Sequence, residues 1–205
     1  MHAYEVVIPP PWTHIDLGNR GGAEQQVMGL VDRAMEQLPR DMPPDQVGPM
    51  RRSLARRISG ALEQARESGG IELFLPTETW HGFHNGSSFI VAEVEPDVRP
   101  PAEVTAENYP ALVMGEMLER PAARAVHTAN SIWVRTERVH PPDVVPEVDV
   151  PTVSVDYLTP APQSPGSWIG VMFSTVGDGD PASQSTRLSV ELFDAIMSTW
   201  TWIDP

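Results

Sequence analysis

The last third of the chain, residues 168–202, constrains the fold more than any other stretch. It begins with the nearly continuous apolar run WIGVMFST, which is typical of a strand with both faces buried. The polar segment VGDGDPASQS then favours a turn, and we expect Asp180 or Ser183 to cap the helix that follows. That helix is predicted over residues 187–202, RLSVELFDAIMSTWTW, where it ends on two tryptophans.

This strand and this helix predict how the layers lie against each other. Alternate side chains of a strand point to opposite faces, so the two faces should meet different helical layers. We expect one face to present Ile169, Val171 and Phe173, and the other to present Trp168 and Met172. The predicted buried stripe of the helix consists of residues about one turn apart, namely Leu188, Leu192, Ile196 and Trp200.

Two long helices are predicted in the N-terminal third. Over residues 21–38 and about 44–68, apolar residues recur at three- and four-residue spacing, which places them on one face. The segment RDMPPDQ ends the first helix, and Gly69-Gly70 ends the second. A proline-rich turn between two amphipathic helices predicts an antiparallel helical hairpin.

Most of the remaining chain consists of short apolar or alternating runs separated by proline, glycine and asparagine. Strands are predicted at 4–8, 14–17, 71–75, 89–95, 124–127, 131–140, 152–158 and 168–175, and a short helix at 111–118. Consecutive strands joined by turns pair antiparallel. The sequence therefore predicts a single α+β domain over residues 1–205, with an antiparallel sheet of about six or seven strands. The N-terminal helical hairpin and the C-terminal helix should flank that sheet as an α/β/α sandwich.

Composition excludes several classes of function. The net charge of −14 opposes binding to nucleic-acid phosphates and to anionic membrane surfaces. The chain has no cysteine, so disulfides and sulfur-ligated metals are excluded. No apolar run approaches the roughly 20 residues of a membrane span, and the start MHAYEVVIPPPW has no signal-peptide pattern. We expect a cytoplasmic protein that binds no nucleic acid and inserts in no membrane.

The segment TETWHGFHNGSS, between two predicted strands, is the best candidate for chemistry. Glu78, His81 and His84 are residue types that bind zinc, and the two histidines lie three positions apart. The segment has neither an HExxH frame nor a third histidine nearby, so we expect no metal. A metal-dependent or small-molecule hydrolase remains the alternative. No GxGxxG, P-loop or GxSxG motif occurs, so no cofactor is expected and no catalytic residue is assigned.

Candidate partner-binding residues come from this loop and from the second predicted helix. An aromatic pair in the loop, Trp80 and Phe83, can either pack on the sheet or anchor a partner protein. The helix carries four arginines between positions 51 and 57, the one basic stretch of an acidic chain, although such runs are usually solvated surface. The candidates for binding another protein are Trp80, Phe83, His84, Arg52 and Arg56.

Several segments together resemble a group of uncharacterised actinobacterial proteins. These are PPPW followed by IDL, the two helices up to GG, IELFLP, SVDYLTPAP, and the closing FSTV and ELFDAIMSTWTW. The closing strand and helix are also similar to the PsbP-like fold, which implies an antiparallel sheet flanked by helices on both sides. Members of that fold are mostly binding and assembly factors. Several bacterial relatives are secreted or lipid-anchored, whereas this chain shows no signal peptide and no lipobox cysteine.

The absent catalytic motifs, the acidic composition and this resemblance favour one function over the others. We expect a non-enzymatic protein-interaction or assembly module, accessory to a larger bacterial assembly such as a secretion or envelope-associated machine. The alternative is the hydrolase that would use Glu78, His81 and His84.

Overall fold

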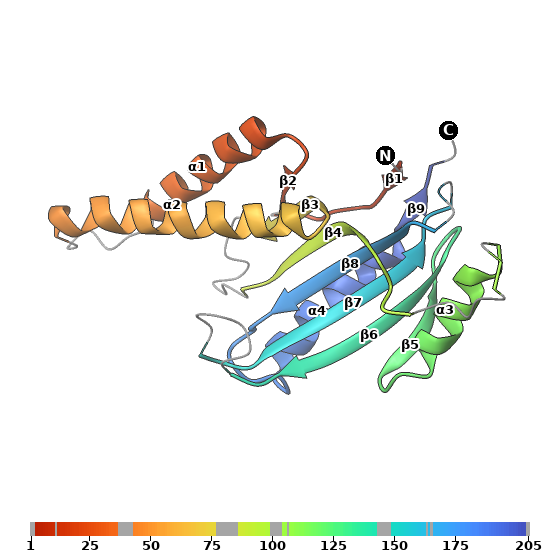
Figure 1. Cartoon of the computed structure of the whole chain (residues 1–205). Helices are drawn as coiled ribbons and strands as arrows, with labels where there is room; N and C mark the ends of the chain where they lie inside the picture. The colour runs from red at the N-terminus through yellow and green to blue at the C-terminus, as the bar shows by residue number, and fades with distance from the viewer. Residues whose placement is uncertain are drawn as a thin grey trace.

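A seven-stranded antiparallel sheet forms the centre of the computed structural model (Figure 1). The structure describes residues 3–10, 12–36, 43–76, 86–98, 104–105, 107–142, 149–162, 164 and 166–203. The strands are β1 (Tyr4–Glu5), β2 (Trp12–Asp16), β3 (Gly70–Pro76), β4 (Ser88–Val94), β5 (Ala123–His127), β6 (Ile132–His140), β7 (Thr152–Pro160), β8 (Trp168–Thr175) and β9 (Thr201–Trp202). The helices are α1 (Arg20–Glu36), α2 (Pro44–Glu67), α3 (Tyr109–Leu118) and α4 (Gln184–Ser198).

The sheet consists of two antiparallel meanders that meet at β4 and β8. Its strand order is β2-β3-β4-β8-β7-β6-β5, and every neighbouring pair is antiparallel. The predicted pairing of residues 71–75 with 89–95 is confirmed by β3 and β4, and that of 124–127 with 131–140 by β5 and β6. The predicted antiparallel α+β fold, with helices flanking the sheet, is therefore confirmed.

Helix α4 covers one face of the sheet, behind the strands as Figure 1 is drawn. The ring of Phe193 is fully buried there and stacks on Phe173 with ring centroids 4.7 Å apart. It also meets Tyr157 edge-on at 5.6 Å. The larger buried residues of this core come from six strands, from α4 and from the turn after it: Phe74, Phe89, Val91, Trp133, Val153, Val155, Tyr157, Ile169, Val171, Phe173, Val190, Phe193, Ile196, Met197, Trp200 and Trp202.

The predicted buried stripe of the last helix is wrong in part. Leu188 is 54% exposed, whereas Ile196 is buried. Four-residue steps advance 400° around a helix with 3.6 residues per turn, so a stripe built only on such steps drifts off the buried face. The observed face uses steps of three and four and contains Thr186, Ser189, Val190, Phe193, Ile196 and Met197.

The predicted end of this helix at residue 202 is also wrong. The helix ends at Ser198, and Thr201 and Trp202 form β9, which pairs with β1 near the other end of the chain. Trp200 is fully buried between these elements and stacks on Tyr4 at 3.9 Å. The predicted cap is confirmed, because the Ser183 hydroxyl accepts a hydrogen bond from the Thr186 amide at 3.1 Å.

The predicted helical hairpin is confirmed on the opposite face of the sheet. Arg20 at the start of α1 pairs with Glu63 near the end of α2, and Asp32 pairs with Arg51, so the two helices run antiparallel. The hairpin packs over β2, β3 and one residue of β4. Its apolar cluster contains Ile15, Leu17, Ala23, Val27, Val31, Leu62, Leu73, Leu75 and Ile90.

Trp168 and Met172 do point away from the α4 core, but the hairpin does not cover them. Trp168 is buried against Val113 of α3 and Val98. Met172 lines a cavity between α3 and the sheet. The sheet is wide enough that the hairpin covers only the β2–β4 side of this face, and the short helix α3 covers the other end.

The burial of Phe193 and the exposure of Leu188 make a paired prediction about stability. Phe193→Ala should lower the free energy of unfolding by about 3–5 kcal/mol, because it leaves a cavity among stacked rings. Leu188→Ala should change it by no more than about 0.5 kcal/mol. Urea unfolding followed by tryptophan fluorescence measures both. Equal losses for the two variants would contradict the observed orientation of α4.

Candidate functional site

Five of the residues singled out in the sequence lie outside the described part of the chain. Glu78, Trp80, His81, Phe83 and His84 all belong to segment 77–85. The metal-binding and partner-binding hypotheses for this loop therefore stay predictions. Among the residues that the structure describes, no group of three or more His, Asp or Glu side chains is placed to hold a metal ion.

The two remaining candidates, Arg52 and Arg56, lie one turn apart on α2 and are both exposed. Their neighbour Arg51 is bound to Asp32 of α1, with Nη2 2.6 Å from Oδ1. Within the described ranges, neither Arg52 nor Arg56 has a carboxylate within ion-pairing distance. These two guanidinium groups are therefore presented to solvent.

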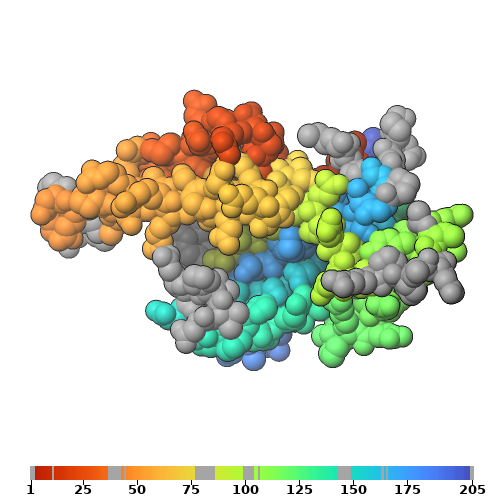
Figure 2. Space-filling view, in the orientation of Figure 1, coloured from red at the N-terminus to blue at the C-terminus, as the bar shows by residue number. Residues whose placement is uncertain are grey.

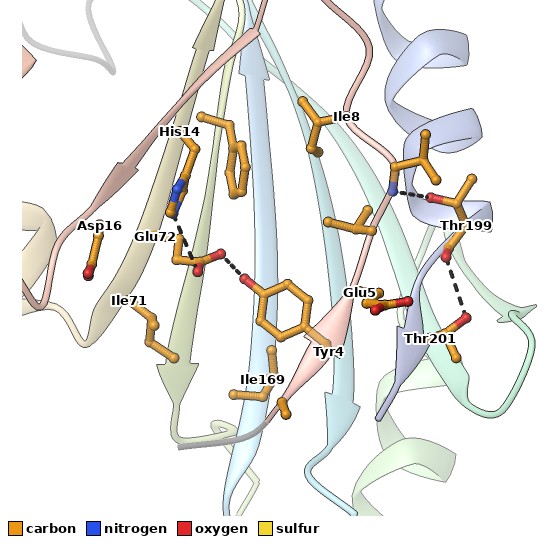
Figure 3. Close-up of a pocket in the computed structure, with 14 residues that line it drawn as sticks. Tyr4, Glu5, Ile8, His14, Asp16, Ile71, Glu72, Ile169, Thr199 and Thr201 are labelled. Carbon is orange, nitrogen blue, oxygen red and sulfur yellow. Dashed lines mark hydrogen bonds and ion pairs between the residues drawn. The ribbon is translucent and has the colours of Figure 1, made fainter. Parts of the chain in front are cut away.

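A cleft of about 680 Å³ lies between the N-terminal arm and the edge of the sheet (Figure 3). The arm, residues 3–8, forms one wall, and Thr199 and Thr201 after α4 extend it. Strands β2 and β3 supply the other wall, because His14 and Asp16 alternate with the buried Ile15 and point to the α4 side. The apolar part of the lining comes from Ile71, Phe74 and Ile169.

A chain of three polar side chains crosses this cleft. The Tyr4 hydroxyl donates a hydrogen bond to Oε2 of Glu72, and Nε2 of His14 lies 3.4 Å from Oε1 of the same carboxylate (Figure 3). Burial and the adjacent Glu72 carboxylate raise the pKa of Tyr4 above its usual value. Glu72 thus holds a neutral phenol on one oxygen and orients an imidazole with the other.

The arm is anchored a second time at its other side. The amide of Val7 donates to Thr199 Oγ1 at 2.9 Å, and that hydroxyl donates to the carbonyl of Ile196 at 2.7 Å. The threonine hydroxyl is therefore engaged in a structural contact. Together, these bonds fasten the arm to β3 and to the end of α4 on either side of the cleft. Glu5 and Asp16 also line the cleft.

Sequence reasoning missed Tyr4, His14 and Glu72. Tyr4 and Glu72 are separated by 68 positions, and the two strands that carry His14 and Glu72 are separated by both long helices. The one available signal was the alternation in WTHID and GIELFLP, where a polar residue occupies the face opposite the hairpin. Alternation identifies the face of the sheet, but it does not identify which strand lies beside it.

A second polar cluster joins the sheet to α4. Arg135 of β6 is only 4% exposed, and its Nε donates to Oδ1 of Asp194 at 2.8 Å. Tyr157 donates to the same carboxylate oxygen at 2.8 Å, and Glu137 accepts from Nη2 of Arg135. Burial alone would lower the pKa of Arg135, but these carboxylates outweigh it and raise the pKa. Burial and Asp194 also raise the pKa of Tyr157.

Comparisons with protein-family models, with curated proteins and with solved structures found no match. The resemblance to the PsbP-like fold therefore stays a prediction. None of the helices in the described part of the chain combines the length and the apolar composition needed to cross a membrane.

The two shielded tyrosines predict a loss of stability at alkaline pH. Their folded pKa values lie above the unfolded value of about 10, so above that pH the unfolded chain binds fewer protons than the folded one. The free energy of unfolding should therefore fall more and more steeply above pH 10, approaching about 2.7 kcal/mol per pH unit near pH 11, from two protons at about 1.36 kcal/mol each.

The chain has neither lysine nor cysteine to titrate in the same range, and Tyr109 is its one further tyrosine. Denaturant unfolding between pH 9 and 11.5 gives the slope. Tyr4→Phe and Tyr157→Phe should each remove about half of it, even where they also lower stability at pH 7. An unchanged slope in both variants would show that these phenols are not protected in the folded state.

Proposed function

We propose that this protein is a non-enzymatic interaction module that docks an acidic partner protein on helix α2. The observation that carries this proposal is the pair Arg52 and Arg56. These two exposed guanidinium groups lie one turn apart, with no carboxylate partner among the described residues.

The position of α2 makes this pair accessible. Figure 1 shows the first half of α2 reaching past the sheet, where α1 is the described helix beside it. The residues of α2 that join the apolar cluster over the sheet begin at Leu54 and continue through Ile58 and Leu62 to Ala65. Two methionines of the hairpin, Met28 and Met50, are also exposed. The hairpin therefore carries exposed cationic groups and, elsewhere on its surface, exposed and adaptable apolar side chains.

The charge of the whole chain gives this patch its selectivity. At a net charge of −14, most of the surface repels an acidic partner, so attraction is confined to the few basic sites. Arginine forms paired, charge-assisted hydrogen bonds with carboxylates, which gives geometric specificity as well as attraction. The side chains of the Tyr4 cleft bond to one another and to the arm, which supports a structural role for that region.

Site-specific crosslinking in the native host tests the proposal. A photoreactive residue at Ser53, which is exposed beside the arginine pair, should capture a defined partner that the same residue at Glu191 on α4 does not capture. With the purified partner, Arg52→Glu combined with Arg56→Glu should weaken binding at least tenfold. The remaining affinity should depend less on salt concentration than that of the unchanged protein.

Arg187→Glu is the control to set beside Arg52→Glu alone, because each reverses one exposed arginine and lowers the net charge by the same amount. It should leave both the affinity and its salt dependence unchanged. Equal weakening by the control would show that net charge alone governs binding. A partner captured equally from both crosslinking positions would contradict docking on α2.

A further inference from the structure

The face of the sheet opposite α4 is only partly covered by helices. The hairpin covers its β2–β4 side and α3 covers its other end. Between them Figure 2 shows a hollow, in which the strands of the sheet are visible below α2. A cavity of about 600 Å³ lies on this face, lined by strands β4, β6, β7 and β8 and by the end of α3. Its volume falls within the range of about 300–1,000 Å³ that is usual for small organic ligands.

The floor of the cavity is apolar. Val94, Val134, Leu158 and Met172 rise from four neighbouring strands on this side of the sheet. Gly170 lies among them, and a Cβ built on it would come 3.2 Å from Val94. Glycine inside a strand weakens it and often marks a place where another group approaches the backbone closely. Here it keeps the middle of the floor free of a side chain.

The wall beside α3 contains an unusual backbone conformation. Ala122 has φ 63°, and no other non-glycine residue in the described ranges has a positive φ. A left-handed alanine is strained, and such residues collect at ligand-binding sites because the surrounding structure must hold them. Together with Pro121, this residue forms the turn from α3 into β5 and lines the cavity.

The described charged side chains that face into the cavity carry a net positive charge. Arg138 pairs with Asp156, with Nη2 2.6 Å from Oδ2. The Nη2 of Arg120 donates only to the backbone carbonyl of Asp97, at 3.3 Å, among the groups that the structure describes. Glu137 also borders the cavity, but its carboxylate is bound to Arg135 on the α4 side. Among the described side chains that line the cavity, two guanidinium groups therefore face one carboxylate, in a chain whose overall charge is −14.

We propose that this cavity binds a small amphiphilic carboxylate, with its apolar body on the sheet and its carboxylate between Arg120 and Arg138. The apolar floor recognises a hydrocarbon or aromatic body by burial. The excess guanidinium recognises an anionic group, and arginine matches the two oxygens of a carboxylate. The site is separate from the arginine pair on α2 and does not depend on the docking proposed there.

Asp156 has a distinct place in this site. Asp156 is paired with Arg138, one of the two arginines assigned to the ligand carboxylate, so its own negative charge repels that ligand. Asp156→Asn should therefore tighten binding of the anion, whereas Arg120→Ala should weaken it. If these side chains had a purely structural role, the two substitutions would not change the affinity for the anion in opposite directions.

The test uses three probes with one chain length: octanoate, octanol and octylammonium. Titration of protein carrying ¹³C-methyl methionine should shift the signals of Met117 and Met172, which line the cavity. Those of Met28 and Met50 on the hairpin should stay in place. We expect octanoate to bind most tightly and octylammonium least. Arg120→Ala should weaken octanoate roughly tenfold or more and leave octanol unchanged.

Arg187→Ala, on α4, serves as the matched control and should leave all three affinities unchanged. Tighter binding of octanoate by Asp156→Asn would further support a carboxylate site at Arg120 and Arg138. Preference for octylammonium, an Arg120→Ala variant that still distinguishes octanoate from octanol, or shifts that fail to saturate at Met117 and Met172 would each overturn the proposal.

Discussion

The buried guanidinium of Arg135 is the constraint on which the packing of α4 depends. It projects from β6 into a core made mainly of apolar side chains, where an unpaired charge would cost several kcal/mol. Asp194 of α4 supplies the compensating charge and also accepts from Tyr157 of β7. Because Asp194 must reach both groups, the helix is held at one rotation and one height over the sheet. That rotation places Phe193 among the rings of the core and leaves Leu188 in solvent.

The two ends of the chain are joined by a second set of contacts. Tyr4 stacks on Trp200, and β1 pairs with β9, so the first described residues complete the core that the last residues build. The hydrogen bond from Tyr4 to Glu72 ties this closure to β3 and creates the cleft beside it. Polar bonds therefore hold the α4 face of the sheet at two places, from Arg135 on β6 to Asp194 and from Glu72 on β3 to Tyr4. The described helices cover the opposite face only in part, and the cavity lies on that face near α3.

Much of the fold could be predicted from short-range patterns. The apolar run of β8, the period of α1 and α2, and the turns between β5 and β6 placed most elements within a few residues of their observed bounds. Two features could not be predicted: the connected polar side chains of Tyr4, Glu72 and His14, and the cavity beside Arg120. Each joins residues from strands that are distant in the chain, and periodicity carries no information about which strands become neighbours. The error at residues 199–202 has the same origin, since only pairing with β1 turns that segment into a strand.

By itself, the sequence determined the α+β class, the antiparallel pairing of adjacent strands, the helical hairpin and the basic pair Arg52 and Arg56, because these follow from local periodicity and charge. Only the tertiary structure decided that β4 pairs with β8, that α3 rather than the hairpin covers Trp168, and that Arg120 and Arg138 line one cavity with an apolar floor. The physical reason is that burial and charge pairing are satisfied between surfaces. Which surfaces meet depends on the whole chain folding at once.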